Sequence, residues 1–148
     1  MRSVRHSIIL LIILSGCAVP AALPERITDV ILGGQTVAVK EAVTPAELAQ
    51  GLAGVVSLPD DKGMLFRFND KRERSFWMKG MVISIDIIWL DGERIIGIER
   101  NVPFEEAGVL LTDLPLYTSP EPADFVLEVA AGFADRYGVG IGDTVKYR

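Results

Sequence analysis

Short apolar runs, separated by turn-forming residues, recur along most of this chain. The clearest run covers residues 83–90, is rich in β-branched residues and ends at Asp91-Gly92. β-Branched residues favour strands, and glycine accepts the positive φ angles that tight hairpin turns require. The pattern predicts a mainly β chain: a β-rich α+β domain, folded as a compact sandwich or barrel with one or two short helices.

The turn signals divide the chain into expected elements. Strands are predicted at residues 27–32, 35–41, 64–68, 74–78, 83–90, 93–100, 125–130 and 144–147. Thr44-Pro45-Ala46-Glu47 has the pattern of a capping box with proline at the first helical position, which predicts a short helix. A second short helix is predicted within residues 132–137, a polar turn at 69–73 and an extended loop with little regular structure at 101–122.

The first residues have the order of a secretory signal. Arg2, Arg5 and His6 form a basic region, and residues 8–14 form an uninterrupted apolar run. A helix needs about 20 apolar residues to cross a hydrocarbon core of roughly 30 Å, so this run is too short for a transmembrane helix. The pattern is typical of an export signal.

Leu14-Ser15-Gly16-Cys17 resembles the lipobox of bacterial lipoproteins, in which the cysteine receives lipid before cleavage. The resemblance predicts a signal peptide at residues 1–16, a lipidated N-terminus and tether at 17–25, and one globular domain at 26–148. The alternative is ordinary secretion, with Cys17 a chance residue. Ala18 follows the cysteine in place of the aspartate associated with inner-membrane retention. We therefore expect an exported protein anchored to the cell membrane or, in a Gram-negative source, to the periplasmic face of the outer membrane.

The charge of the mature chain excludes one class of partner. Removal of residues 1–16 takes Lys and Arg from 15 to 13 against 20 Asp and Glu, a net charge of −7. Nucleic acids require a basic face, so we expect no nucleic-acid partner. The same acidic balance opposes direct binding to anionic lipid, so the expected membrane contact is the lipid on Cys17.

The same cleavage removes the single histidine, His6, and commits the single cysteine, Cys17, to lipid. Ser-His-Asp and Cys-His catalysis are thereby excluded, as are metal sites built on histidine or cysteine. We expect no metal and no cofactor. Stability must come from packing, which the 49% hydrophobic composition of the precursor makes feasible.

Several short motifs are spread over residues 28–147: Gly51-Leu52, Leu58-Pro59, Gly63-Met64-Leu65-Phe66, Ser75-Phe76-Trp77-Met78-Lys79, Asp86-Ile87-Ile88, Leu127-Glu128, Gly132 and Gly142-Asp143. Together they resemble the domain of unknown function 192 family. The resemblance implies a compact β-rich fold and brings no established activity. The family's usual methionine, arginine, asparagine and threonine are replaced here by Ala53, Val55, Gly80 and Met81. A site carried over from the family therefore centres on Trp77, Lys79 and Asp86.

Strand alternation gives an independent interpretation of these residues. Within residues 83–90, Asp86 shares a face with apolar neighbours, so its carboxylate is expected to be solvent-facing, paired or functional. Lys79 is the expected cation for it, and Glu128 is an alternative partner for that lysine. Trp77 points away from Phe76 and towards the side of Lys79. These residues form the candidate polar site: Trp77, Lys79, Asp86 and Glu128.

Two functional classes remain open. The first is a non-catalytic binding or accessory module of the cell envelope that takes a small molecule, a glycan or a protein partner near Trp77 and Lys79. The second is a hydrolase that uses carboxylate, lysine or serine chemistry, with Asp86 as acid or base. An Asp86 that is bonded solely to Lys79 or to backbone amides would exclude the second class.

Overall fold

A computed structural model describes residues 26–104 and 108–148; the predicted signal peptide, Cys17 and tether lie outside this part. The elements, in chain order, are β1 Ile27–Leu32, β2 Gln35–Ala42, α1 Pro45–Gln50, β3 Lys62–Arg72, β4 Ser75–Phe76, β5 Ile85–Asp91, β6 Arg94–Val102, the 3-10 turn η1 Leu111–Asp113, β7 Tyr117–Thr118, β8 Ala123–Ala130, α2 Phe133–Arg136 and β9 Lys146–Tyr147. The predicted mainly β class with one or two short helices is confirmed, and the structure has two short α-helices. Among the described helices, none has the length and apolar character needed to cross a membrane.

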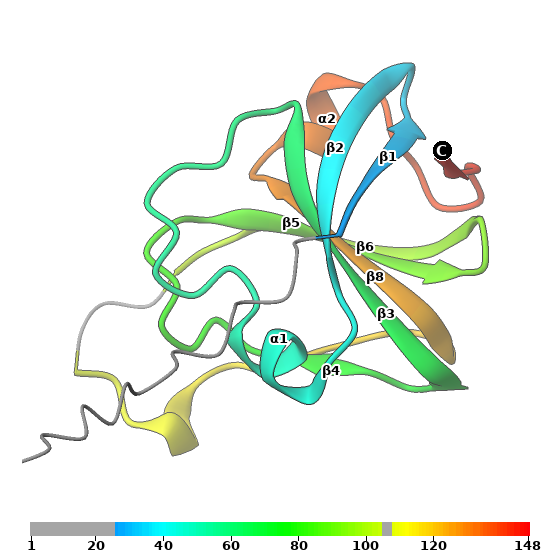
Figure 1. Cartoon of the computed structure of the whole chain (residues 1–148). Coiled ribbons are helices and arrows are strands. Elements are labelled where there is room, and N and C mark those ends of the chain that lie inside the picture. The colour runs from blue at the N-terminus through cyan, green and yellow to red at the C-terminus, as the bar shows by residue number, and fades with distance from the viewer. Residues whose placement is uncertain (1–25, 105–107) are drawn as a thin grey trace, which may run out of the picture.

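Seven strands form one strongly curled sheet in the order β6-β5-β8-β3-β2-β1-β9, and β4 and β7 form a separate ribbon (Figure 1). The β2–β3 pair is parallel, and the other neighbours are antiparallel. The two edges of the sheet approach each other, because Arg94 forms an antiparallel bridge with Thr144 and the amide of Ile95 donates to the carbonyl of Asp143. The sheet is therefore barrel-like, as the sequence predicts.

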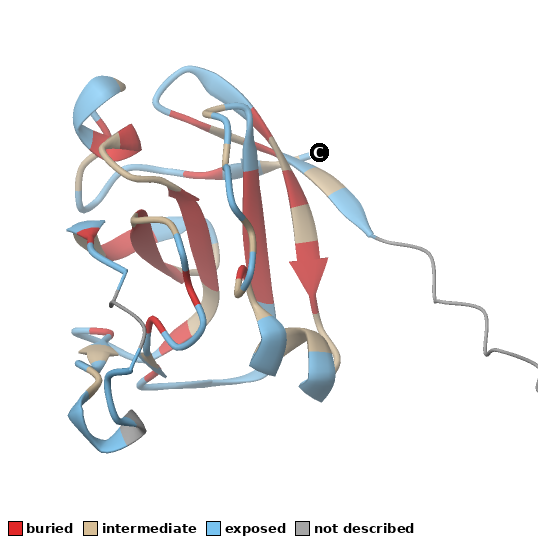
Figure 2. Cartoon of the chain, turned by 90° about the vertical axis from the view of Figure 1, so that its left-hand side faces the viewer, coloured by how far each residue is buried: buried red, intermediate tan, exposed pale blue. Residues whose placement is uncertain are grey.

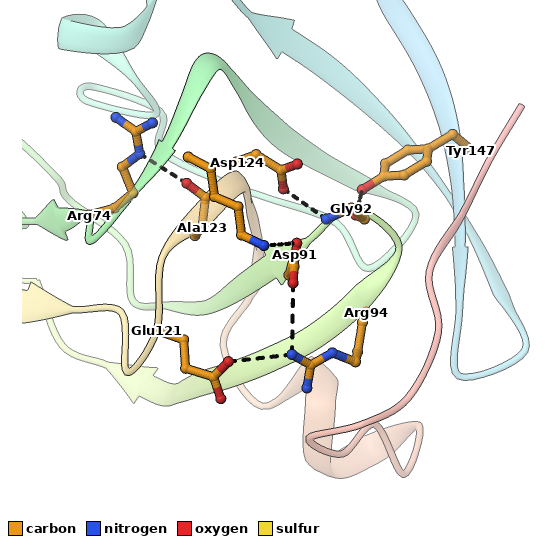
Figure 3. A network of polar contacts seen from close by, with 9 residues as sticks. Arg74, Asp91, Gly92, Arg94, Glu121, Ala123, Asp124 and Tyr147 are labelled. Carbon is orange, nitrogen blue, oxygen red and sulfur yellow. Dashed lines mark hydrogen bonds and ion pairs between the residues drawn. The ribbon is translucent and has the colours of Figure 1, made fainter.

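The β5–β6 turn is fastened to three other parts of the barrel (Figure 3). The amide of Gly92 donates to the Asp124 carboxylate on β8 at 2.8 Å, and its carbonyl accepts from the Tyr147 hydroxyl on β9 at 2.9 Å. Asp91 pairs with Lys71 at the end of β3. These bonds tie the two edge regions of the sheet together.

The face of the sheet that the curl encloses is buried, and the outer face is buried over β3, β5, β6 and β8 (Figure 2). The first core lies on the face enclosed by the curl, and its members come from strands all around the barrel and from α2. They include Val30, Val37, Leu65, Ile88, Ile95, Leu127, Phe133 and Val145. The second core lies on the outer face of β3, β5, β6 and β8 and is covered by α1, the β4–β7 ribbon and the adjoining loops. It includes Leu52, Met64, Phe66, Met78, Met81, Ile87, Trp89 and Val126.

Helix α1 begins where the sequence predicts. The Glu47 amide donates to Thr44 Oγ1 at 3.2 Å, and the Thr44 amide donates to Glu47 Oε2 at 2.8 Å, which completes the capping box. Hydrogen bonds from the amides of Thr44 and Val43 hold the pKa of Glu47 down to about 2. Such caps contribute about 1 kcal/mol, which matters for a helix of six residues that has no buried side chain.

One prediction of local structure was wrong, and a second was incomplete. The expected polar turn at residues 69–73 is largely strand, because β3 continues to Arg72 and pairs there with Ala123 of β8 after a register shift. Its polar side chains remain exposed, so backbone pairing overrides their turn propensity. The expected loop at 101–122 has little regular structure, but it contains the two-residue strand β7, which pairs with β4 in the register Phe76↔Tyr117.

Candidate functional site

A pocket of about 400 Å³ opens on the outer face of the barrel. Helix α1 and the turn after it form one wall, β3 supplies Phe66 and Phe68, and the segment from Arg72 to Met81 forms the opposite wall. One residue of β8, Glu128, also lines it. The volume lies within the range of about 300–1,000 Å³ that is typical of small-molecule sites.

Glu128 forms the floor of this pocket. Alternation along β8 turns its neighbours Leu127 and Val129 into the enclosed core, and directs Glu128 to the outer face with Val126. Its partners across the sheet are Met64 on β3 and Ile87 on β5, neither of which offers a polar side chain.

The carboxyl of Glu128 is buried without a complete set of partners. The residue is 6% exposed, and among the described residues none hydrogen-bonds to its Oε2. Burial raises the pKa of Glu128 to about 8, because the charged form is desolvated and no neighbouring charge compensates it. At neutral pH this carboxyl is therefore mainly protonated and is able to donate one hydrogen bond.

Aromatic rings form the apolar body of the site. Phe76 lies edge-to-face against Phe66, with ring centroids 4.9 Å apart, and against Trp89 at 5.4 Å. The guanidinium carbon of Arg74 lies over the ring of Phe68, 3.9 Å from the ring centroid. These rings fix one another's orientation, so the walls of the pocket are preorganised rather than loose.

The rim of the pocket consists of its exposed charged and aromatic residues: Arg72, Glu73, Trp77 and Lys79. Trp77 is 47% exposed, and the ammonium of Lys79 lies 5.5 Å from its ring centroid. Lys79 forms no ion pair with any described residue, whereas Arg72 pairs with Asp70 at 3.3 Å.

Arg74 is a wall residue rather than a free cation. It is 5% exposed, and its guanidinium donates to the carbonyl of Ala123 and to the carbonyl and carboxylate of Asp70. Figure 3 shows its bond to Ala123 at the start of β8. Arg74 thus ties the pocket wall to the strand that carries Glu128.

Asp86 lies away from this pocket. It is fully buried on β5, on the opposite face of the sheet from Glu128. One oxygen accepts the amides of Asn101 and Gly132 at 2.8 and 2.9 Å, and the other accepts the amide of Ala134 at 2.9 Å. These bonds hold Asn101 and Gly132 in positive-φ conformations and cap the start of α2. The carboxylate therefore organises backbone, and the expected Lys79–Asp86 pair does not form.

The structure thus brings three of the four candidate residues to one pocket, Trp77, Lys79 and Glu128, and places Asp86 elsewhere. Sequence reasoning missed the contribution of α1 and of Phe68. No local pattern marks that helix as part of a site. Among the described residues, no group of three His, Cys, Asp or Glu side chains is placed to hold a metal ion.

The departures from the family pattern adjoin the pocket. Met81 lines it, and Val55 packs against the second core. Ala53 and Gly80 are neighbours: a Cβ built at Gly80 would lie 3.3 Å from that of Ala53. In this chain the flank of the pocket is therefore made of small and apolar residues.

Comparisons with known proteins place this domain among uncharacterised relatives. The profile of the family DUF192, described as "Uncharacterized ACR", matches residues 28–147. A structure from Novosphingobium aromaticivorans DSM 12444, described as a protein of unknown function, is 30% identical with a TM-score of 0.71, covering 88% of this chain and 94% of that one. One from Sinorhizobium meliloti 1021, described as a candidate transcription regulator, is 30% identical with a TM-score of 0.70, covering 83% and 92%. No functionally curated protein matches the chain.

Proposed function

The chain belongs to the DUF192 family, whose description records no activity, and from that premise we propose that its domain is a non-catalytic binding module of the cell envelope. Its ligand is a small molecule held in the pocket above Glu128. The proposal extends to the chain as a whole: an exported lipoprotein, anchored through Cys17.

One observation carries the binding proposal: Glu128 Oε2 is buried without a partner on the floor of a pocket of about 400 Å³. A buried polar group without a hydrogen bond costs about 1–3 kcal/mol, so folded proteins rarely keep one unless it has a use. A ligand that supplies the missing hydrogen bond would recover this cost on binding. The preorganised aromatic walls offer such a ligand an apolar surface to bury.

The contacts of Asp86 weigh against a carboxylate hydrolase. That residue was the candidate acid or base, and its two oxygens are occupied by three backbone amides. The pocket's serine, Ser75, has its hydroxyl 3.0 Å from that of Thr118, with no base between them. Neither group has the arrangement of an activated nucleophile.

The position of Arg26 supports a membrane-proximal pocket. Arg26 is the first described residue, and its guanidinium pairs with Glu47 of α1 at 3.5 Å. Eight residues lie between Cys17 and Arg26, and the nine steps of an extended chain from one to the other reach at most about 30 Å. A lipid on Cys17 would therefore hold the α1 wall of the pocket within about that distance of the membrane surface.

The candidate-regulator description of one structural relative applies to that protein. For this chain, a net charge of −5, or −7 after cleavage, opposes contact with nucleic-acid phosphates. We therefore do not extend that description to it.

The binding proposal is tested by looking for the ligand itself. Wild-type protein and a Glu128→Leu variant, each purified from bacterial membranes, are compared by native mass spectrometry with a Glu93→Gln variant, in which an exposed glutamate is changed. A small molecule should accompany wild type and Glu93→Gln at about one per chain, and be depleted in Glu128→Leu. The binding proposal fails if all three proteins carry no small molecule, or carry the same one equally.

The anchoring proposal is tested separately. The full chain and its Cys17→Ala variant are expressed in a bacterium supplied with a fatty acid that carries an alkyne label. Labelling of the wild type and loss of label in Cys17→Ala, with retention of the precursor mass, are expected. Equal labelling of both, or a wild-type product that still begins at Met1, would contradict the proposal.

A further inference from the structure

The floor and the rim of the pocket each present a polar group that the described protein leaves without a strong partner. At the floor, Glu128 is buried between Met64 and Ile87, and its Oε2 lacks a hydrogen bond. At the rim, Lys79 is exposed and has no ion pair among the described residues. A ligand that spans the pocket from floor to rim meets both groups.

Some of the charged side chains around the pocket already have ion-pair or hydrogen-bond partners, and others do not. Arg72 is paired with Asp70, and the buried Arg74 has donated its hydrogen bonds to Asp70 and Ala123. Glu73 is the acidic residue of the rim. Lys79 is therefore the cation best placed to accept a new anionic partner.

We infer that the ligand is a small carboxylic acid with an apolar body, whose carboxylate pairs with Lys79 and whose other end carries an uncharged oxygen acceptor for the Glu128 carboxyl. This inference rests on the proposed binding function and names its ligand class. A single unpaired lysine matches a singly charged carboxylate better than a phosphate dianion. The phenylalanine rings between floor and rim match an apolar body.

The protonation state of Glu128 decides which chemical group the ligand must present to this carboxyl. Burial raises the pKa of Glu128 to about 8, so at pH 7 about nine in ten of these carboxyls are protonated. A protonated carboxyl donates to a ketone, ester or hydroxyl oxygen. No titratable side chain faces it from Met64 on β3 or Ile87 on β5, and α1 contributes only uncharged residues to the pocket. Besides Glu128, the charged groups of the lining come from the end of β3 and the segment after it: Arg72, Glu73, Arg74 and Lys79.

The test uses a matched set of probes of increasing length, from 4-oxopentanoate to 8-oxononanoate. Each keto acid is paired with its methyl ester, with the alkanoate that lacks the ketone, and with a trimethylammonium ketone of equal length. Dissociation constants are measured by calorimetry on the purified protein. At least one keto acid should bind about tenfold more tightly than its ester, its alkanoate and its trimethylammonium counterpart.

Two variants assign the two contacts. Lys79→Gln should weaken the best keto acid about three- to tenfold and leave its ester unchanged, whereas Lys146→Gln, an exposed lysine on β9, should change neither. Glu128→Leu should remove the preference for the keto acid over the alkanoate. For wild type, affinity should fall above pH 8, by up to tenfold per pH unit, as the Glu128 proton is lost.

Tighter binding of the trimethylammonium ketones, with affinity that rises with pH, would overturn the inference and show a cation site. Absence of binding by every probe would overturn it as well. Neither result decides the proposed binding function, because the co-purified molecule of the mass spectrometry experiment reports on that function directly. A native ligand that is neutral or cationic would support the binding function and would refute the inference that the ligand is a carboxylic acid.

Discussion

Replacing Glu128 by glutamine keeps the shape of the buried side chain and removes its ability to ionise. In wild type the folded state holds this carboxyl at a pKa of about 8, whereas the ordinary value of 4.5 applies to the unfolded chain. Between these two pH values the unfolded chain releases the proton and the folded protein keeps it. The unfolded state therefore binds fewer protons, and the stability of wild type falls as the pH rises.

The size of the effect follows from the two pKa values. Each pH unit between 4.5 and 8 removes about 1.4 kcal/mol from the free energy of unfolding. At pH 5 the loss is below about 1 kcal/mol, at pH 7 it is about 3 kcal/mol, and above pH 8 it levels off at about 4–5 kcal/mol. The Glu128→Gln variant escapes this loss, so its stability relative to wild type should rise by these amounts.

Urea denaturation at pH 5, 6, 7 and 8.5 measures the difference between the two proteins. Other titrating groups cancel in that difference, and a constant offset from the amide of glutamine leaves its slope unchanged. Glu93→Gln, which removes an exposed carboxyl, serves as the control for the loss of one acid. If the difference in free energy of unfolding between Glu128→Gln and wild type does not change between pH 5 and 8.5, the assignment of a buried, protonated carboxyl is refuted.

Three further changes test the framework around the pocket by urea denaturation. Asp86→Ala should cost at least about 3 kcal/mol because three backbone amides lose their acceptor, and Asp86→Asn should cost less; wild-type stability in both would contradict the assigned role. Gly63→Ala should cost about 1–3 kcal/mol because its Cβ would lie 2.7 Å from the carbonyl oxygen of Glu128; unchanged stability would mean that β3 and β8 separate freely. Thr44→Ala should cost about 1 kcal/mol through loss of the α1 cap, and no loss would mean that the cap is dispensable.

Local signals were sufficient where a few adjacent residues set the conformation. The β1–β2 hairpin is found with the paired glycines Gly33-Gly34 at its turn, both at positive φ, and α1 begins at its capping box. The hairpin of β5 and β6 turns at Asp91-Gly92. In each case the residues of the turn or cap themselves favour its conformation, so the element could be predicted without knowledge of a distant partner.

Local signals failed where a partner far along the chain decides the conformation. The polar residues 69–72 have turn composition but extend β3, because β8 offers a backbone to pair with. Residues 117–118 lie among prolines and still form β7, because β4 is available as a partner. A strand is completed by hydrogen bonds to its neighbour, and that neighbour is not visible in the local sequence.

The candidate site divides in the same way. Alternation within β8 and β5 places Glu128 and Asp86 between apolar neighbours, which the sequence alone determined. Their different roles are set by the order of strands in the sheet. Asp86 meets the amides of Asn101, Gly132 and Ala134, which lie 15 to 48 residues away, and Glu128 meets only Met64, Ile87 and the pocket. The sequence placed two acids among apolar strand residues, and the tertiary structure decided that both are buried, that one holds backbone and that the other faces a pocket, because a carboxyl's surroundings are set by contacts that folding brings together.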